Sequence, residues 1–388
     1  MEIKPQSKIE KIIAPVYEFI RLEYAGGIFL FVSVLVALIW ANSPFSSSYH
    51  HLWEIKLPVG FGDYVLDKPL HIWINDGLMA IFFFVIGLEL KREFMDGGLS
   101  TPQKAALPMV AALGGMLLPA LIYALINRGV ESAHGWGIPM ATDIAFALAL
   151  ISMSGKHIPA SVKVFLSALA VADDLGAILV IAFFYGTGLH LVPLGTAAVL
   201  LLVLAAGNRL GIKHTAFYLL IGIGVWLGFL LSGIHATIAG VLVAFTIPRV
   251  ILPKIEHRLH PWVAFLIMPL FALANAGMDI GASFFSSLAN PVSLGVMTGL
   301  IAGKFIGVLL FTWLMVRFGW AQLPEQANWK HIIGVAFLAG VGFTMSLFIS
   351  NLAFENTLFI EQAKYGILTA SVISGLLGLA VLKYFKKS

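Results

Sequence analysis

Residues 160–186 read ASVKVFLSALAVADDLGAILVIAFFYG, an apolar run interrupted near its middle by Asp173 and Asp174. A helix needs about 20 apolar residues to cross a hydrocarbon core of ~30 Å. This run is long enough, but it places two carboxylates where lipid is expected. A charge at a helix centre costs roughly 2.5–3.5 kcal/mol on insertion scales, so each carboxylate requires a partner, a cavity or a function.

Similar apolar runs recur along the whole chain. The 388 residues are 59% hydrophobic and only 11% charged, whereas soluble domains are about a quarter charged. We therefore expect an all-α polytopic membrane protein whose residues 1–388 form a single transport domain in the lipid bilayer. Its expected spans are 25–41, 69–90, 105–127, 137–153, 160–186, 191–206, 215–232, 234–248, 262–277, 292–316, 331–353 and 365–385, about twelve transmembrane helices.

The basic residues predict an orientation. Nineteen Lys and Arg fall on the side of the N-terminus and four on the other, with Lys304 left inside a span. The positive-inside rule then places both termini in the cytoplasm. The net charge of +4 is thus an orientation signal, and we expect no nucleic-acid partner. Met1–Tyr24 is amphipathic and does not resemble a cleavable signal peptide.

The longest connection on the less basic side, residues 42–68, is expected to hold a β-hairpin. Trp53–Leu57 and Asp63–Asp67 alternate in polarity around Gly60-Phe61-Gly62, a pattern typical of two strands joined by a turn. An isolated hairpin has unpaired edges and is only marginally stable. The pattern leaves two interpretations open, an ordered cap over the helices or an element of a homodimer.

Charged residues inside spans are the main functional signal. At least five lie in mid-span, namely Asp76, Asp143, Asp173, Asp174 and Lys304. Neighbouring helix positions point about 100° apart, so of Asp173 and Asp174 one can line a cavity while the other faces a cation such as Lys304. Mutual repulsion and loss of water favour a proton on at least one of two such carboxylates. When ionised, the same group is a hard oxygen ligand for Na⁺ or Li⁺, so proton and cation would compete for it.

Two spans carry signs of interruption. Ile138–Phe146 contains a proline and sets Thr142 beside Asp143, and Gly340–Phe348 is rich in glycine. They are fourth and eleventh in order, at the centres of helix triplets 3–5 and 10–12, which start on opposite sides of the membrane. Interrupted helices at corresponding positions of inverted repeats indicate a transport site at the midplane. Asp143 and Lys304 are candidates for compensating the exposed half-helix dipoles.

A charged rim is expected on the basic side. Its residues are Glu89, Arg92, Glu93, Glu256, His257 and His260. They fit either an interfacial salt-bridge network or a pH-sensitive cluster, since histidine changes charge between pH 5 and 8. His235 is expected mainly as a hydrogen-bonded packing residue, and it is kept as a further pH-sensing candidate.

The residue types exclude several other functions. The chain has no cysteine, so thiol catalysis and Cys-ligated zinc are excluded, and we expect no cofactor and no enzymatic activity. The main alternative is a secondary carrier that couples Na⁺ or H⁺ to another small solute. An anionic solute would need a cationic pocket, but the mid-span charges are one lysine and four carboxylates. A passive channel would not need titrating carboxylates.

The motifs together resemble a known family, the NhaA-type sodium/proton antiporters. The resemblance covers essentially the whole chain, and it rests on Trp73-Ile-Asn-Asp76, Gly87-Leu-Glu89 with Lys91-Arg-Glu93, Ala141-Thr-Asp-Ile-Ala-Phe-Ala147, Asp173-Asp-Leu-Gly176, Ser232-Gly-Ile-His-Ala-Thr237, Glu256-His257 with His260-Pro-Trp262, Gly303-Lys304 and Gly342-Phe-Thr-Met-Ser346. Inverted repeats with interrupted helices are themselves known from NhaA.

The resemblance implies an electrogenic antiporter of the bacterial inner membrane that exports Na⁺ or Li⁺ for protons and is active at alkaline pH. It implies Asp174 as the main ion ligand and Asp173 as the second titrating carboxylate, paired with Lys304. Thr142 and Asp143 would lie where the two interrupted helices cross. The charged rim would sense pH, and the hairpin within 42–68 would mediate a homodimer.

Overall fold

The protein is described here from a computed structural model, which places residues 25–61, 64–155, 157–186, 188–281 and 284–384. The expectations for Met1–Tyr24, Gly62 and Asp63 lie outside these residues. In the first half of the chain the elements are α2 (Ala25–Ala41), α3 (Ser46–Glu54), β1 (Lys56–Phe61), β2 (Tyr64–Pro69), α4 (Leu70–Ile72), η1 (Trp73–Leu78), α5 (Met79–Met95), α6 (Pro102–Ile126), η2 (Glu131–Met140), α7 (Ile144–Met153) and α8 (Ala160–Phe184).

In the second half, two long helices each contain one wider π-helical turn, as η1 does before α5 in the first half. The elements are α9 (Leu191–Arg209), α10 (Thr215–Ser232), α11 (Thr237–Thr246), α12 (Leu252–Trp262), η3 (Val263–Ile267), α13 (Met268–Asn275), α14 (Phe284–Ser287), α15 (Pro291–Thr298), η4 (Gly299–Gly303), α16 (Lys304–Arg317), α17 (Trp329–Ala339), α18 (Phe343–Ala353) and α19 (Thr357–Tyr384). The two π-helical turns are η3 and η4. Between α17 and α18 the helix is interrupted, from Ala339 to Phe343.

The described residues include nine helices long and apolar enough to cross a membrane, or up to eleven if each of two bent pairs counts as one span. The bent pairs are α2 with α3 at 114° and η2 with α7 at 43°, and α11 is a shorter apolar helix. The protein is therefore a multi-pass, mainly helical membrane protein, as predicted. The count of twelve stays a prediction, because the segment at 234–248 holds a helix of only ten residues, Thr237–Thr246.

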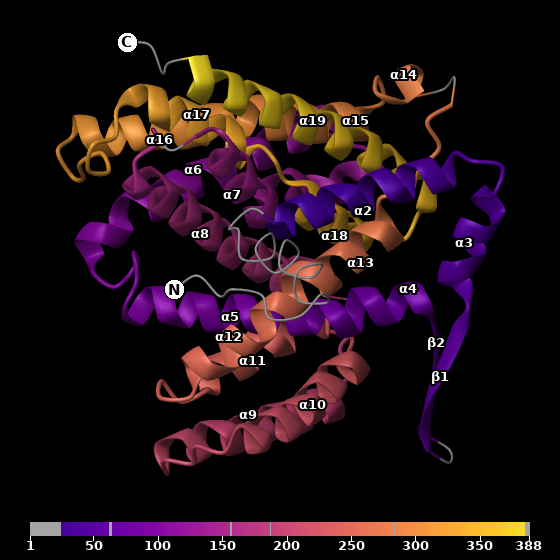
Figure 1. Ribbon diagram of the computed structural model, residues 1–388. Helices are drawn as coiled ribbons and strands as arrows, with labels where there is room; N and C mark the ends of the chain where they lie inside the picture. The colour runs from indigo at the N-terminus through magenta and orange to yellow at the C-terminus, as the bar shows by residue number, and fades with distance from the viewer. Residues whose placement is uncertain (1–24, 62–63, 156, 187, 282–283, 385–388) are drawn as a thin grey trace, which may run out of the picture.

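The helices form one bundle around α6, α7 and α8 (Figure 1). Figure 1 shows α17 and α19 on one side of these helices and the α9–α10 pair at the opposite edge. Apolar side chains fill one core among α5, α10, α11, α13 and α18, and a smaller one among α6, α8, α16 and α17. The site described below lies where these groups of helices meet.

Small residues set the distance between α6 and α16. A Cβ atom at Gly307 would lie 2.1 Å from the carbonyl oxygen of Gly114, so only glycine allows this approach. Close packing of small residues is a main source of helix association in lipid, where the hydrophobic effect between helices is weak. This contact lies one turn from Lys304 and so places its side chain against the centre of the bundle.

The predicted β-hairpin is confirmed, with corrected boundaries. β1 pairs antiparallel with β2, from Lys56 opposite Pro69 to Phe61 opposite Tyr64. The first strand does not begin at Trp53, which belongs to helix α3 and is buried. Gly60 and Phe61, expected in the turn, are paired residues of β1. The last turn of a short amphipathic helix shows a similar alternation in polarity, so the predicted strand extends too far toward the N-terminus.

Candidate ion-binding site

Asp173 and Asp174 lie side by side in α8, with 0% and 1% of their surfaces exposed. An unbroken helix separates their directions by about 100°, and their surroundings differ accordingly. Asp173 Oδ2 forms an ion pair with Lys304. Asp174 instead lines a cavity, while the Oδ1 atom of each of the two carboxylates has no hydrogen-bond partner among the described residues. The pair therefore consists of one neutralised carboxylate and one carboxylate available to a small cation or a proton.

Lys304 is fully buried and follows the π-helical turn η4 directly. Such turns are frequent at functional sites because they redirect the side chains that follow. Besides the ion pair with Asp173, its Nζ donates a hydrogen bond of 3.0 Å to Thr142 Oγ1. Thr142 Oγ1 lies 2.6 Å from Asp173 Oδ2 and 2.9 Å from the carbonyl oxygen of Ala339, and its single hydrogen serves one acceptor at a time. The three side chains thus form one buried polar group.

The two interrupted helices lie against each other at their breaks. Between Met140 and Ile144 the chain leaves η2 and enters α7, and between Ala339 and Phe343 it leaves α17 and enters α18. The backbone N–H of Asp143 donates to the carbonyl of Val341 at 2.7 Å. Each break thus supplies a backbone partner that the other requires, because a buried unpaired backbone group is costly in a membrane.

The Asp143 carboxylate caps two half-helices at once. Its Oδ1 accepts a hydrogen bond of 3.1 Å from Phe146 N, in the first turn of α7. Its Oδ2 accepts from Thr344 N at 3.0 Å, in the first turn of α18, and also from the Thr344 hydroxyl. Two helix N-termini carry partial positive charge, so one buried carboxylate compensates both. Lys304 lies near the negative, C-terminal end of α17. Its Nζ donates to Thr142 Oγ1, which in turn can donate to the carbonyl oxygen of Ala339 at the end of that helix.

A cavity of about 460 Å³ leads to the acidic residues. Its wall includes both Asp174 and Asp143, together with Thr344 at the crossing. Further along, Glu89 and His260 line the same space. A continuous hollow therefore connects the charged rim to the buried carboxylates.

The charged rim is assembled from two helices that the sequence places far apart. α5 and α12 bring together Glu89, Arg92, Glu93, Glu256, His257 and His260.

Within the rim, Arg92 is the central cation. It forms an ion pair with the buried Glu256 and lies 3.5 Å from Glu93. Glu93 also accepts a hydrogen bond of 2.7 Å from the backbone of Gly98. His260 Nε2 is 4.0 Å from Glu89 Oε1, a contact that becomes an ion pair only when the ring is protonated.

Two other predicted residues lie apart from this site. Asp76 is partly exposed in η1, near the hairpin, where it lines a small hollow with Lys68. It is therefore not a mid-span charge, because its span, Leu70–Met95, begins only six residues earlier. His235 lies in the connection between α10 and α11, and its Nε2 contacts the carbonyl oxygen of Tyr185. Neither residue belongs to the cavity wall.

Comparison with known proteins decides the family. The family model described as Na⁺/H⁺ antiporter 1 matches residues 17–382. The chain belongs to this family. A relative from Oleidesulfovibrio alaskensis, named Na(+)/H(+) antiporter NhaA, is 46% identical over 97% of this chain and 95% of its own. Proteins of the same name from Rhodospirillum rubrum and Pelagibacter ubique are 47% and 46% identical, covering 96% and 98% of this chain and 98% and 100% of theirs.

One important residue of the site, Thr344, was not predicted from the sequence. Its backbone and hydroxyl are both partners of Asp143. The signal was present, because Thr344 follows the glycines that interrupt the second helix, at the position where an N-terminal turn has free N–H groups. Nothing in the linear sequence, however, connects this turn with a carboxylate two hundred residues away.

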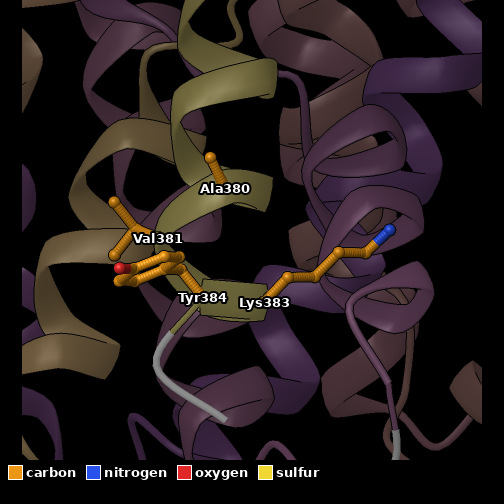
Figure 2. Close-up of a pocket in the computed structure, with 4 residues that line it drawn as sticks. All are labelled: Ala380, Val381, Lys383 and Tyr384. Atoms are coloured by element: carbon orange, nitrogen blue, oxygen red, sulfur yellow. The ribbon is translucent and has the colours of Figure 1, made fainter. Parts of the chain in front are cut away.

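A second cavity has, among the described residues, no side chains suited to binding a cation. It has a volume of about 540 Å³ and lies at the end of α19, lined by Ala380, Val381, Lys383 and Tyr384. Figure 2 shows Lys383 pointing away from Val381 and Tyr384. The wall contains no carboxylate, so it offers a cation no anionic ligand. The smaller, acidic cavity is the better candidate site.

Removal of the Asp143 side chain is expected to lower stability strongly. Asp143→Ala leaves two buried backbone donors without acceptors, which costs about 2–6 kcal/mol at roughly 1–3 kcal/mol for each. Thermal unfolding of the purified protein in detergent measures this loss. Asp143→Asn is the matched control, because its amide oxygen still accepts from one helix, and it should lose clearly less. Equal melting temperatures for Asp143→Ala and the wild type would contradict the capping role.

Proposed function

We propose that this protein is an electrogenic antiporter that exports Na⁺ or Li⁺ in exchange for protons and is more active at alkaline pH. The observation that carries the proposal is the different surroundings of two adjacent buried carboxylates, with Asp173 paired to Lys304 and Asp174 facing the cavity. Membership of the Na⁺/H⁺ antiporter 1 family and relatives named Na(+)/H(+) antiporter NhaA support it. The protein acts as a transporter and not as an enzyme.

The exchange follows from competition at Asp174. A carboxylate stripped of water holds either a proton or a hard cation, because it lacks other partners that would stabilise its charge. Na⁺ entering from the rim displaces the proton, and a proton entering from the other side displaces Na⁺. Asp173 and Lys304 form a second titrating group beside it, so that more protons enter than Na⁺ ions leave and net charge moves.

Access alternates through the interrupted helices. We assign α6, η2–α7 and α8 to one repeat, and α15–α16, α17–α18 and α19 to a second, inverted repeat. The two breaks contact each other beside the acidic pair. Movement of one repeat against the other would expose Asp174 first to the rim side and then to the hairpin side.

The protein is proposed to lie in the bacterial inner membrane with both termini in the cytoplasm. The rim then faces the cytoplasm and the hairpin faces outward, in agreement with the excess of basic residues on the rim side.

Transport by the purified protein in liposomes tests the function. The liposomes carry an inside-acid pH gradient and a trapped pH dye, and NaCl, LiCl, KCl or choline chloride is added outside between pH 6.5 and 8.5. Na⁺ and Li⁺ should collapse the gradient, and more strongly at high pH. If no alkali cation moves protons, the proposal is wrong and the acidic core serves another solute.

The charged rim is proposed to regulate transport by pH. Arg92→Ala breaks the ion pair with Glu256 and removes the central cation of the rim. We expect it to shift the pH of half-maximal activity while leaving the maximal rate within about twofold, because rim charges influence the site only across a screened distance. The liposome assay across pH measures both. Lys254→Ala, which changes an exposed residue on the helix of Glu256, should leave the profile unchanged.

The hairpin is proposed to join two copies of the protein. Among the described residues β1 and β2 pair only with each other, which leaves an edge of each strand for a partner. Because the chain has no cysteine, Val59→Cys introduces a single thiol on an exposed strand position. Oxidation should yield covalent dimers with Val59→Cys but not with Leu210→Cys, an exposed position at the end of α9. Equal yields would argue against the hairpin as the contact.

A further inference from the structure

Three asparagines from three different helices, two of them buried and Asn351 partly buried, form a hydrogen-bonded cluster. Asn75 lies in η1, Asn275 ends α13, and Asn351 lies in α18. The Nδ2 of Asn275 donates to Asn75 Oδ1 at 2.9 Å, and Asn275 Oδ1 accepts from Asn351 Nδ2 at 2.8 Å and from Asn75 Nδ2 at 3.3 Å. Asn75 and Asn275 are only 9% and 6% exposed. Buried polar groups with no role in the acidic site therefore meet at one point.

The cluster continues the line of the cavity. Phe82, Met268 and Thr344 line the cavity, and each stands seven residues from one of the asparagines on its own helical segment. Seven residues are about two turns and a rise of about 10 Å. In α5 and α13 the asparagine lies on the side of the cavity remote from the charged rim, and Asn75 follows the hairpin closely in the chain. The order is thus rim, cavity, acidic pair and asparagines.

An aromatic layer separates the cavity from the cluster. Phe348 packs against Phe83, with ring centroids 5.2 Å apart, and against Phe271, with centroids 6.2 Å apart. Phe271 and Phe348 lie between a cavity-lining residue and an asparagine on their helices. The structure is therefore closed to the hairpin side by an apolar layer, with a polar layer behind it.

The amide groups of the polar layer are suited to bind a cation that is in transit. Amide oxygens are hard ligands suited to alkali cations, but they carry no net charge. A site on a transport path must bind strongly enough to admit an ion and weakly enough to release it, which favours neutral ligands over a second carboxylate. In the closed arrangement the amides satisfy one another. Asn75 also lies in a π-helical turn, a feature frequent at functional sites.

We propose that Asn75, Asn275 and Asn351 form a second, weaker Na⁺ site on the hairpin side of Asp174, through which the cation leaves when the aromatic layer opens. The inference rests on the proposed antiport. Na⁺ that leaves Asp174 exchanges the carboxylate for amide oxygens before it is fully hydrated, so this site governs exchange at the hairpin face and not capture at the rim.

Kinetics measured separately at the two faces test the inference. Full-length protein is assayed in inside-out and right-side-out membrane vesicles, with ²²Na⁺ and a pH dye as readouts. We expect Asn275→Leu to raise the KM for Na⁺ at the hairpin face about tenfold and to lower the maximal rate, because Asn275 contributes the shared oxygen. The KM at the rim face should stay within about twofold of the wild type. Asn275→Asp, which adds a charge to the site, should lower the hairpin-face KM.

Control variants distinguish an ion site from a latch, that is, a set of hydrogen bonds that only holds helices together. Asn208→Leu removes an amide that joins two other helices through the carbonyl of Thr246, and it should change neither KM. Asn351→Leu is a second variant of the cluster in case Asn275→Leu does not fold. If Asn275→Asp leaves the hairpin-face KM unchanged, or if the variants alter the rim-face KM instead, the cluster is a latch and the inference is overturned. Absence of Na⁺–H⁺ exchange in the wild type would overturn the proposed function itself.

Discussion

Asp174→Asn is expected to abolish Na⁺-dependent proton movement, with a rate at least about 100-fold below the wild type, a barrier change of roughly 2.7 kcal/mol. Asparagine has nearly the same shape, but it neither titrates nor carries the charge that binds Na⁺. The fold should persist, because Asp174 Oδ1 has no hydrogen-bond partner among the described residues that the change would disrupt. Removal of a buried charge is neutral or stabilising when no partner depends on it.

Two measurements on this variant separate transport from folding. Exchange is followed in liposomes, and thermal unfolding is followed in detergent. Asp96→Asn is the matched control, since Asp96 is a carboxylate with 52% of its side chain exposed, paired with Arg249 at the surface. It should exchange ions like the wild type. Normal activity in Asp174→Asn, or a collapsed fold, would remove Asp174 from its assigned role.

Lys304→Ala is expected to have the largest effect on stability. Breaking a buried ion pair by removing one partner typically costs 3–5 kcal/mol, because the remaining charge stays buried without compensation. Here the remaining charge is Asp173, and Thr142 also loses the hydrogen bond from the Lys304 ammonium. The loss of the cation should also move the pH dependence of exchange to more alkaline values, because the Asp173 carboxylate is then less stabilised against protonation.

A double-mutant cycle measures the pair itself. Asp173→Asn removes the charge that Lys304→Ala would leave uncompensated, so the double variant should be more stable than the sum of the single losses predicts, by about 0.5–3 kcal/mol. Lys254→Ala, exposed at the surface, should leave the melting temperature unchanged. Strict additivity of Asp173→Asn and Lys304→Ala would mean that the pair contributes no coupling energy.

The membrane character, the acidic pair and the interrupted helices were predictable from local sequence. An apolar run with two carboxylates at its centre permits few structures, and proline or glycine in a span weakens the helix there. The breaks at 141–143 and 340–342 lie where the motifs with Thr142 and Gly342 indicated. These features depend on short stretches of chain, which is why the sequence alone sufficed.

Features that depend on tertiary contacts were not predictable. Asp143 was a candidate for compensating half-helix dipoles, but its partner Thr344 lies about two hundred positions away, and no periodicity encodes that contact. Helix α12 of the rim begins at Leu252 instead of near Trp262, because its first turns are amphipathic and lack the continuous apolar run that indicates a span. The asparagine cluster was missed for a related reason. Each amide alone has ordinary interpretations, and only their meeting across three helices distinguishes them.

The most direct test of the account is whether Na⁺ displaces a proton from Asp174. The purified protein is placed in a weakly buffered detergent solution with a pH dye, and NaCl is added, with choline chloride at equal ionic strength as the control. Na⁺, but not choline, should release protons from the wild type, and Asp174→Asn should greatly reduce the release. Absence of release from the wild type, or undiminished release from Asp174→Asn, would contradict competition of Na⁺ and H⁺ at this carboxylate.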